Sequence, residues 1–376
     1  MPTLRSEAPD TLRRKKPEDR VTTDQATPVS RPAPARATGH RSRRPVGLFL
    51  VATTVLIVLS VLSVAVGSRQ IPLDQVVQTL LDRAGARTAD PQIEAIVWGV
   101  RLPRTVLGLL VGMALGLSGA LMQGLTRNPL ADPGLLGVTA GAALGIVLAI
   151  AWFGIATLYG YIWFAFAGAL LASVVVYLLG GLGRGGSTPV KVALAGVAMT
   201  FLLNSVTSAV VLRDPDALNR YRFWAAGSLS GPDFGTIGQL LPFLAVGTVL
   251  ALASAPALNS LALGDDVAAA LGRRVGLIRL QGTLAVTLLA GAAVAVAGSI
   301  VFVGLVVPHV ARLITGPNHR WLLPFTMVLA PSLLLLADIL GRVIARPSEV
   351  GVGIIAAFIG GPFFIMLVRR RRLAEL

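Results

Sequence analysis

The sequence has no cysteine and few charged residues, and each shortage excludes some kinds of protein or site. Charged residues make up 14% of the 376 residues, whereas 54% are hydrophobic. Soluble globular chains carry about 25% charged residues, and a single water-soluble core cannot hide so many apolar side chains. The composition therefore predicts a protein whose main solvent is the lipid bilayer. The missing cysteines exclude disulfides and thiolate metal sites.

Motifs for catalysis are also missing. The three histidines, His40, His309 and His319, lack the spacing of a metal site, and the sequence contains neither HExxH nor a nucleophile elbow. The pattern GxxxxGK[ST] is absent, so the chain is not itself the ATPase of a P-loop system. Residues 181–186 match GxGxxG, but no strand–turn–helix unit surrounds them, and we interpret them as a turn. We expect no catalytic site and no metal site in this chain.

Basic residues gather at both ends of the chain. The net charge is +15, residues 1–45 contain 11 Lys/Arg against 5 Asp/Glu, and residues 369–372 are all arginine. Residues 1–44 are rich in Arg, Pro, Thr and Ala without apolar periodicity, which predicts a disordered tail. Basic clusters beside apolar helices indicate a cytoplasmic face and anionic lipid. We therefore expect both termini in the cytoplasm and no nucleic-acid binding.

Ten apolar segments follow the tail and predict an all-α, polytopic membrane domain over 45–372 with about ten transmembrane helices. The segments cover 46–66, 104–124, 135–155, 161–181, 190–212, 235–255, 278–298, 301–316, 321–341 and 350–368. The segment 301–316 is short, and a broken helix there would make the count nine or eleven. With ten helices, the expected inner loops are 182–189, 256–277 and 317–320. The expected outer loops are 67–103, 213–234 and 342–349.

Three patterns lie on the predicted helices. Arg101 and Arg104 are three residues apart on one helical face at the outer surface, where they serve either as interfacial anchors or as contacts for a partner. The doubled GxxxG motif of residues 108–116 predicts close helix packing. Asp338 is an intramembrane carboxylate and thus a functional candidate, but Arg342 lies four residues later and favours a plain ion pair.

Two patterns lie between predicted helices. Residues 126–137 contain two prolines and a glycine in an apolar setting, which indicates either an ordinary loop or irregular backbone beside a water-filled path. Residues 263–272 predict a short helix in the long inner loop, with Asp265 as its N-cap and Gly272 as its end. This helix is either plain structure or a rigid knob for a cytoplasmic partner.

Taken together and in order, these stretches resemble the FecCD-like permease family of bacterial importers for iron–siderophores, haem and cobalamin, the type II ABC importers. The resemblance spans roughly 46–372 and rests on the stretches 101–138, 258–272, 293–314 and 333–343. Relatives often have Pro where this chain has Ser299 and Gly351, and Gly where it has Val301. These positions lie around helix ends.

The resemblance implies a permease in a bacterial plasma membrane that pairs with a second permease, as a homodimer or with a paralogue, around one translocation path. Two cytoplasmic ATPases would use ATP and Mg, and an external binding protein would deliver the substrate; the chain itself would hold no cofactor. The implied docking residues for the binding protein are Arg101, Arg104 and Arg342. The implied gate residues are Asn128, Leu130, Ser187 and Thr188. The implied ATPase-coupling residues are Leu263, Gly264, Asp265, Asp266, Ala269, Leu271 and Gly272.

A secondary active transporter of a small solute is the alternative function. Such a protein couples to ions through buried carboxylates or broken helices, and the predicted helices contain almost no acidic residues. The sequence does not identify the transported compound, and it does not distinguish a homodimer from a heterodimer.

Overall fold

A computed structural model describes residues 44–82, 90–134, 137–155, 157–181, 189–213, 221 and 224–372 of the protein. Within these ranges the regular structure is helical. The helices are α1 (Arg44–Ala65), α2 (Leu73–Asp82), α3 (Pro91–Ile96), the π-helix η1 (Val97–Arg101), α4 (Leu102–Thr126), α5 (Val138–Phe153), α6 (Leu158–Gly181), α7 (Pro189–Val211), α9 (Phe234–Ala253), α10 (Ala255–Leu261), α11 (Asp265–Ala270), α12 (Val275–Ala297), α13 (Val303–Thr315), α14 (His319–Ile344) and α15 (Val352–Arg372).

Each of the ten predicted apolar segments corresponds to one helix. Within the described residues, seven stretches of helix are long and apolar enough to cross a membrane, and three shorter apolar helices, α5, α13 and α15, complete the set. At 1.5 Å per residue, the 13 residues of α13 span only about 20 Å, which is less than the ~30 Å hydrocarbon core. The prediction of an all-α polytopic protein is confirmed, and α13 is the short element at 301–316.

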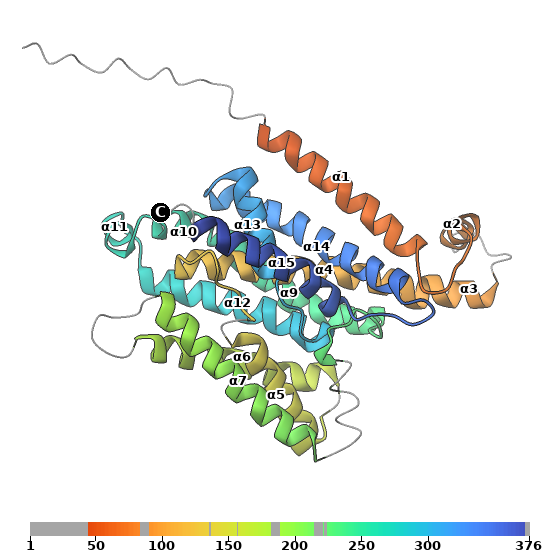
Figure 1. Ribbon diagram of the computed structural model, residues 1–376, viewed down its shortest axis with the longest axis horizontal. Helices are drawn as coiled ribbons and strands as arrows, with labels where there is room; N and C mark the ends of the chain where they lie inside the picture. The colour runs from red at the N-terminus through yellow and green to blue at the C-terminus, as the bar shows by residue number, and fades with distance from the viewer. Residues whose placement is uncertain are drawn as a thin grey trace, which may run out of the picture. The chain divides into compact units, whose positions relative to one another are not determined.

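The helical bundle has two ends, named here after the short helices that lie there (Figure 1). The α11 end carries α10 and α11, and the α2 end carries α2 and α3. α14 begins at the α11 end, where the Asn259 side chain of α10 accepts the backbone N–H of His319 at 2.9 Å. α1 ends beside Arg342 at the α2 end, and α15 starts there beside Gly341. Residues 44 and 372 consequently lie at the α11 end, as an even number of crossings requires.

The doubled GxxxG motif forms the face along which α4 packs against α13 and α14. A Cβ built on Gly112 would lie 2.6 Å from Pro331 Cα, and one on Gly116 would meet Thr326 Cγ2 at 2.9 Å. One on Gly119 would collide with the backbone of Gly304 at the start of α13. The absence of side chains therefore lets three helix backbones come together, as the motif predicts.

The predicted outer loop 67–103 contains more helix than the sequence analysis expected. α2, α3 and η1 lie within it, and η1 runs directly into α4. Val76 of α2 and Val97 of η1 are buried against Val64 of α1, and Trp98 Nε1 donates to the Thr79 carbonyl at 3.1 Å. The apolar positions of α2 recur at helical spacing over 10 residues. Such an amphipathic helix is too short and too polar to stand out among membrane spans.

We predict that Gly119→Ala destabilises the protein by about 1–3 kcal/mol, because the new methyl group meets backbone that has no rotamer to change. Gly238→Ala on α9 is the matched control, since a Cβ there meets nothing within 4 Å. That control should be neutral or stabilising by about 0.4–1 kcal/mol. Thermal unfolding of both purified variants in the same detergent measures the difference. Equal unfolding temperatures would contradict the close packing of α4 on α13.

Candidate functional site

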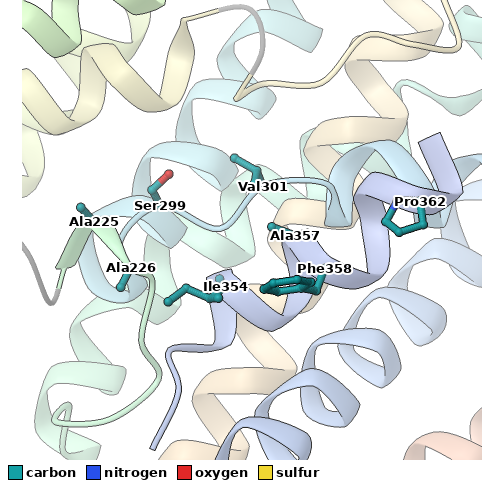
Figure 2. Close-up of a pocket in the computed structure, with 9 residues that line it drawn as sticks. Ala225, Ala226, Ser299, Val301, Ile354, Ala357, Phe358 and Pro362 are labelled. Atoms are coloured by element: carbon teal, nitrogen blue, oxygen red, sulfur yellow. The ribbon is translucent and has the colours of Figure 1, made fainter. Parts of the chain in front are cut away.

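A hollow of about 460 Å³ opens between α15 and the segment that joins α12 to α13 (Figure 2). Its lining side chains carry no charge. They belong to Ala225, Ala226, Ser299, Val301, Gly353, Ile354, Ala357, Phe358 and Pro362. Phe358 is 75% exposed in the single chain. The hollow is an open, mainly apolar surface with a single hydroxyl, so it offers shape and little specific bonding.

Irregular backbone inside the bundle builds one wall of this hollow. After α12 the chain leaves the helix at Gly298, whose φ is +72°, and α13 starts only after Phe302, whose φ is +70°. A Cβ at Gly298 would collide with the Trp224 carbonyl, and Ser228 N–H donates to the Ala297 carbonyl at 2.9 Å. Such backbone occurs at membrane depth only when it is packed in protein or lines a cavity. Ser299, Val301 and Gly351 all lie outside helices, as expected from their place near helix ends.

At the α2 end, Arg104 and Arg342 share the carboxylate of Asp338. Nε and Nη2 of Arg104 donate to Asp338 Oδ1 at 3.0 and 2.7 Å, and Arg342 Nη2 lies 2.9 Å from Asp338 Oδ2. The predicted i,i+4 ion pair between Asp338 and Arg342 is therefore confirmed. Arg104 Nη1 also donates to Glu349 Oε2 at 2.6 Å.

Arg342 and a third arginine, Arg101 of η1, also hold the C-terminal end of α1. Arg342 Nη1 donates to the carbonyls of Ser63 and Val66, both at 2.8 Å. Arg101 Nη1 donates to the Ala65 carbonyl at 2.7 Å. These carbonyls have no partner within the helix, and cations at a helix C-terminus also interact favourably with its dipole. Asp338 and the three arginines thus join α1, η1, α4 and α14 at one point.

The three arginines predicted as docking residues do come together, but they are buried. Arg101, Arg104 and Arg342 are 3%, 6% and 2% exposed, so they lie below the protein surface. A hollow of about 170 Å³ reaches them, and its rim includes Arg69 and Glu349. Burial alone would raise the pKa of the Glu349 carboxyl, but the hydrogen bond and charge of Arg104 outweigh it and hold that pKa below its usual value.

At the α11 end, α4 ends in a compact turn that contains two of the predicted gate residues. Arg127 closes the helix in the left-handed conformation, with φ of 51°. Asn128 Oδ1 accepts the backbone N–H of Leu130 at 3.0 Å, and both side chains are half-buried. Asp132 is buried and accepts the Gly134 N–H at 2.8 Å. The turn folds back against α13, since a Cβ at Gly304 would lie 2.8 Å from Asp132 Oδ2.

The short helix predicted at 265–271 exists as α11, but Asp265 does not cap it. The N-cap is Gly264, and no side chain bonds to the first turn. The Asp265 carboxylate points instead to Arg127 and Arg279, at 3.2 and 2.7 Å. Two guanidinium groups attract a carboxylate more strongly than one backbone N–H does, so the cap prediction was wrong. Gly272 does end the helix, with φ of +77° after Leu271.

The remaining coupling residues lie on the surface of α11 or next to it. Leu263 and Leu271 are 63% and 59% exposed, and Asp266 and Ala269 are also exposed. Ala268 is the residue of α11 that is buried. The predicted gate residues Ser187 and Thr188 lie outside the described residues.

Sequence reasoning missed the hollow beside α15 and the partners Glu349 and Arg279. A signal for the hollow was present, because Gly298-Ser299 separates two apolar segments and Gly360-Gly361-Pro362 interrupts the last one. No local signal links Arg104 to Glu349 or Arg279 to Asp265, since these pairs form between separate helices and loops.

A model of the FecCD transport family matches residues 55–370. The chain belongs to this family. Among its relatives is the ferric enterobactin transport system permease protein FepD of Escherichia coli (strain K12), which is 48% identical over 84% of this chain and 93% of its own length. The hemin transport system permease protein HmuU of Yersinia pestis is 39% identical over 73% of this chain and 84% of its own length.

A solved structure shares the fold of this FecCD chain. It is described as an inward-facing conformation of a metal-chelate type ABC transporter. It has a TM-score of 0.70 and 29% identity, and the match covers 86% of this chain and 99% of that chain.

We predict that Asp338→Asn destabilises the protein by about 3–5 kcal/mol, because it leaves Arg104 and Arg342 buried without their shared counter-charge. Glu349→Gln is the matched control, since its side chain is 32% exposed and its ion pair is with Arg104. It should cost less than about 1 kcal/mol. Unfolding of both variants in detergent provides the comparison. A wild-type unfolding temperature for Asp338→Asn would show that the cluster adds nothing to stability.

Proposed function

We propose that this chain is the membrane-spanning permease subunit of an ATP-driven importer. Its substrate is an iron–siderophore complex, or a haem- or cobalamin-type complex, that crosses the cytoplasmic membrane of a bacterium. The match to the FecCD family over residues 55–370 carries this proposal. The names of its relatives, among them a ferric enterobactin permease and a hemin permease, support the substrate class.

The hollow beside α15 is proposed as one half of the translocation path, which a second permease subunit completes. The lining has no charged side chain that could hold the cargo tightly. This supports the assignment, because a bulky complex must leave the path as readily as it enters. The exposed apolar side chains of Ile354 and Phe358 at 42% and 75% suit either a second subunit or the cargo. Whether that subunit is identical or a paralogue does not change this geometry.

ATP and Mg are used by two ATPase subunits, which we place at the α11 end and therefore in the cytoplasm. The exposed apolar side chains Leu263, Val267 and Leu271 support this placement, because α11 is too short to cross a membrane and a partner subunit would cover them. The basic residues 369–372 form the end of α15, the last apolar helix, and favour the same side. The cytoplasmic gate is assigned to Asn128 and Leu130 together with Ser187 and Thr188.

We predict that membrane vesicles containing the permease, its ATPase and its binding protein take up a ferric siderophore only when ATP is enclosed. Uptake should be unchanged when ionophores collapse the proton and sodium gradients, because ATP hydrolysis supplies the free energy. Isotopic iron retained in the vesicles measures it. Uptake that follows an ion gradient without ATP would support the secondary transporter instead.

The substrate-binding protein is proposed to dock at the α2 end through Arg101, Arg104 and Arg342. Four arginines, including Arg69 on the rim, line this hollow, and the carboxylates paired with them are Asp338 and Glu349, which leaves a surplus of positive charge. A carboxylate of the partner would balance that surplus. Because the three inner arginines are buried, reversing their charge would disturb the fold as well as docking, so Arg69 on the exposed rim gives the cleaner test.

We predict that Arg69→Glu weakens docking of the binding protein about two- to tenfold and makes docking less sensitive to salt. Arg320→Glu, an equal change of charge at the α11 end, is the matched control and should leave docking unchanged. Binding of the purified binding protein to permease in nanodiscs at several salt concentrations measures both. Identical salt dependence in wild type and Arg69→Glu would place the docking surface elsewhere.

A further inference from the structure

The Asp265 carboxylate lies between three parts of the bundle. Its Oδ1 is 3.2 Å from Nη2 of Arg127 at the end of α4. Its Oδ2 accepts a hydrogen bond from Nη2 of Arg279 on α12 at 2.7 Å. Arg279 Nη1 in turn donates to the Tyr177 hydroxyl on α6 at 2.9 Å. One carboxylate on a short surface helix therefore contacts α4 directly and reaches two longer helices through Arg279.

α11 has few other attachments to the bundle. Ala268 is its buried residue, whereas Val267, Ala269 and Ala270 are exposed. The neighbouring acid Asp266 is exposed and forms none of the ion pairs found among the described residues. Asp265 therefore carries the ion pairs that connect α11 to the end of α4 and to α12.

Arg127 connects this carboxylate to the turn that carries the proposed gate. It is the left-handed C-cap of α4, and its backbone N–H donates to the Gln123 carbonyl. Asn128, the next residue, shares that carbonyl at 3.2 Å and accepts the Leu130 N–H. The backbone of Arg127 is thus part of the turn, while its guanidinium holds α11.

We propose that Asp265 and Arg127 form a mechanical link through which a displacement of α11 moves the turn at 127–130. Both are positioning residues, because neither needs to touch ATP or the transported complex. The proposal rests on the proposed function, in which α11 seats on the ATPase. The proposal adds the Asp265–Arg127 contact, which transmits the movement from the ATPase-binding helix α11 to the gate.

Exposure of the pair suits such a link. Arg127 and Asp265 are 45% and 37% exposed at their side chains, and exposed ion pairs contribute little to folding. Their loss should leave the bundle intact and change the balance between open and closed gates by at most about fivefold. A pair buried like that of Asp338 would be too costly to rearrange in every transport cycle.

The test uses the complete importer, reconstituted with its ATPase and binding protein. Asp265→Asn, Arg127→Gln and the double variant are compared for ATPase recovery, ATP hydrolysis and siderophore transported per ATP. We expect normal recovery, continued hydrolysis and a two- to fivefold loss of transport per ATP in each single variant. The double variant should be no worse than either single variant, because the two residues act through one contact. Arg127→Lys should restore part of the loss.

The state of the proposed gate can be measured directly by cysteine crosslinking, because the chain lacks cysteine. In a Leu130→Cys background, crosslinking across the permease dimer should depend on nucleotide, and Asp265→Asn should weaken that dependence. Arg320→Gln removes a cation from the same end of the bundle and should change none of these quantities. Unchanged transport per ATP in Asp265→Asn, or losses that multiply in the double variant, would overturn the link.

Ala269→Arg separates this inference from the function on which it rests. A bulky cation on the exposed face of α11 should prevent recovery of the ATPase with the permease. If the ATPase is still recovered with the permease, it does not bind at α11 and the proposed coupling surface is wrong. If Ala269→Arg prevents recovery of the ATPase while Asp265→Asn and Arg127→Gln transport normally, α11 does bind the ATPase. In that case only the proposed link between Asp265 and Arg127 is wrong.

Discussion

The close approach of α4 to α13 and α14 is the constraint on which both ends of the bundle depend. Gly112, Gly116 and Gly119 leave no room for a side chain between these helices. At the α2 end this closeness places Arg104 against Asp338. Towards the α11 end, Gln123 Nε2 donates to the carbonyls of Gly304 and Leu305 at 3.3 and 3.2 Å. Neither contact would form if α4 stood one side chain further away.

The two ends differ in how their charges are held, and this difference matches the work proposed for each. At the α2 end, Asp338 and its arginines are buried and tie α1, α4 and α14 together. Breaking such a cluster is costly, so this end should move as one body. At the α11 end, the pairs of Asp265 are about one-third exposed and can exchange with water at low cost. Elements that move during function are expected among such weakly held contacts.

The ten membrane helices were predictable because lipid contact requires long apolar runs, and each run corresponds to one helix. The pair Asp338–Arg342 was predictable because helical spacing of four brings the side chains together. Arg104 lies 234 residues from Asp338, and no local pattern encodes that contact. The same limit explains the wrong cap for Asp265, since its actual partners come from α4 and α12. Amphipathic α2 was missed because it is neither long nor strongly apolar.

The buried carboxylates give a physical reason to prefer ATP over an ion gradient as the energy source. A gradient-driven carrier can couple to ions through a buried acidic group that gains and loses a cation during each cycle, or through a broken helix. Among the described residues, Asp132 and Asp338 are the buried carboxylates. Asp338 is fixed between two guanidinium groups, and Asp132 accepts the backbone N–H of Gly134. Loading a proton or sodium ion on Asp338 would first require breaking contacts that hold the bundle together, whereas the hydrogen bond of Asp132 to Gly134 is local to its turn. The uncharged hollow beside α15 offers no carboxylate in their place. In the proposed function, the free energy for opening and closing the proposed path enters from outside the membrane domain, through the exposed helix α11.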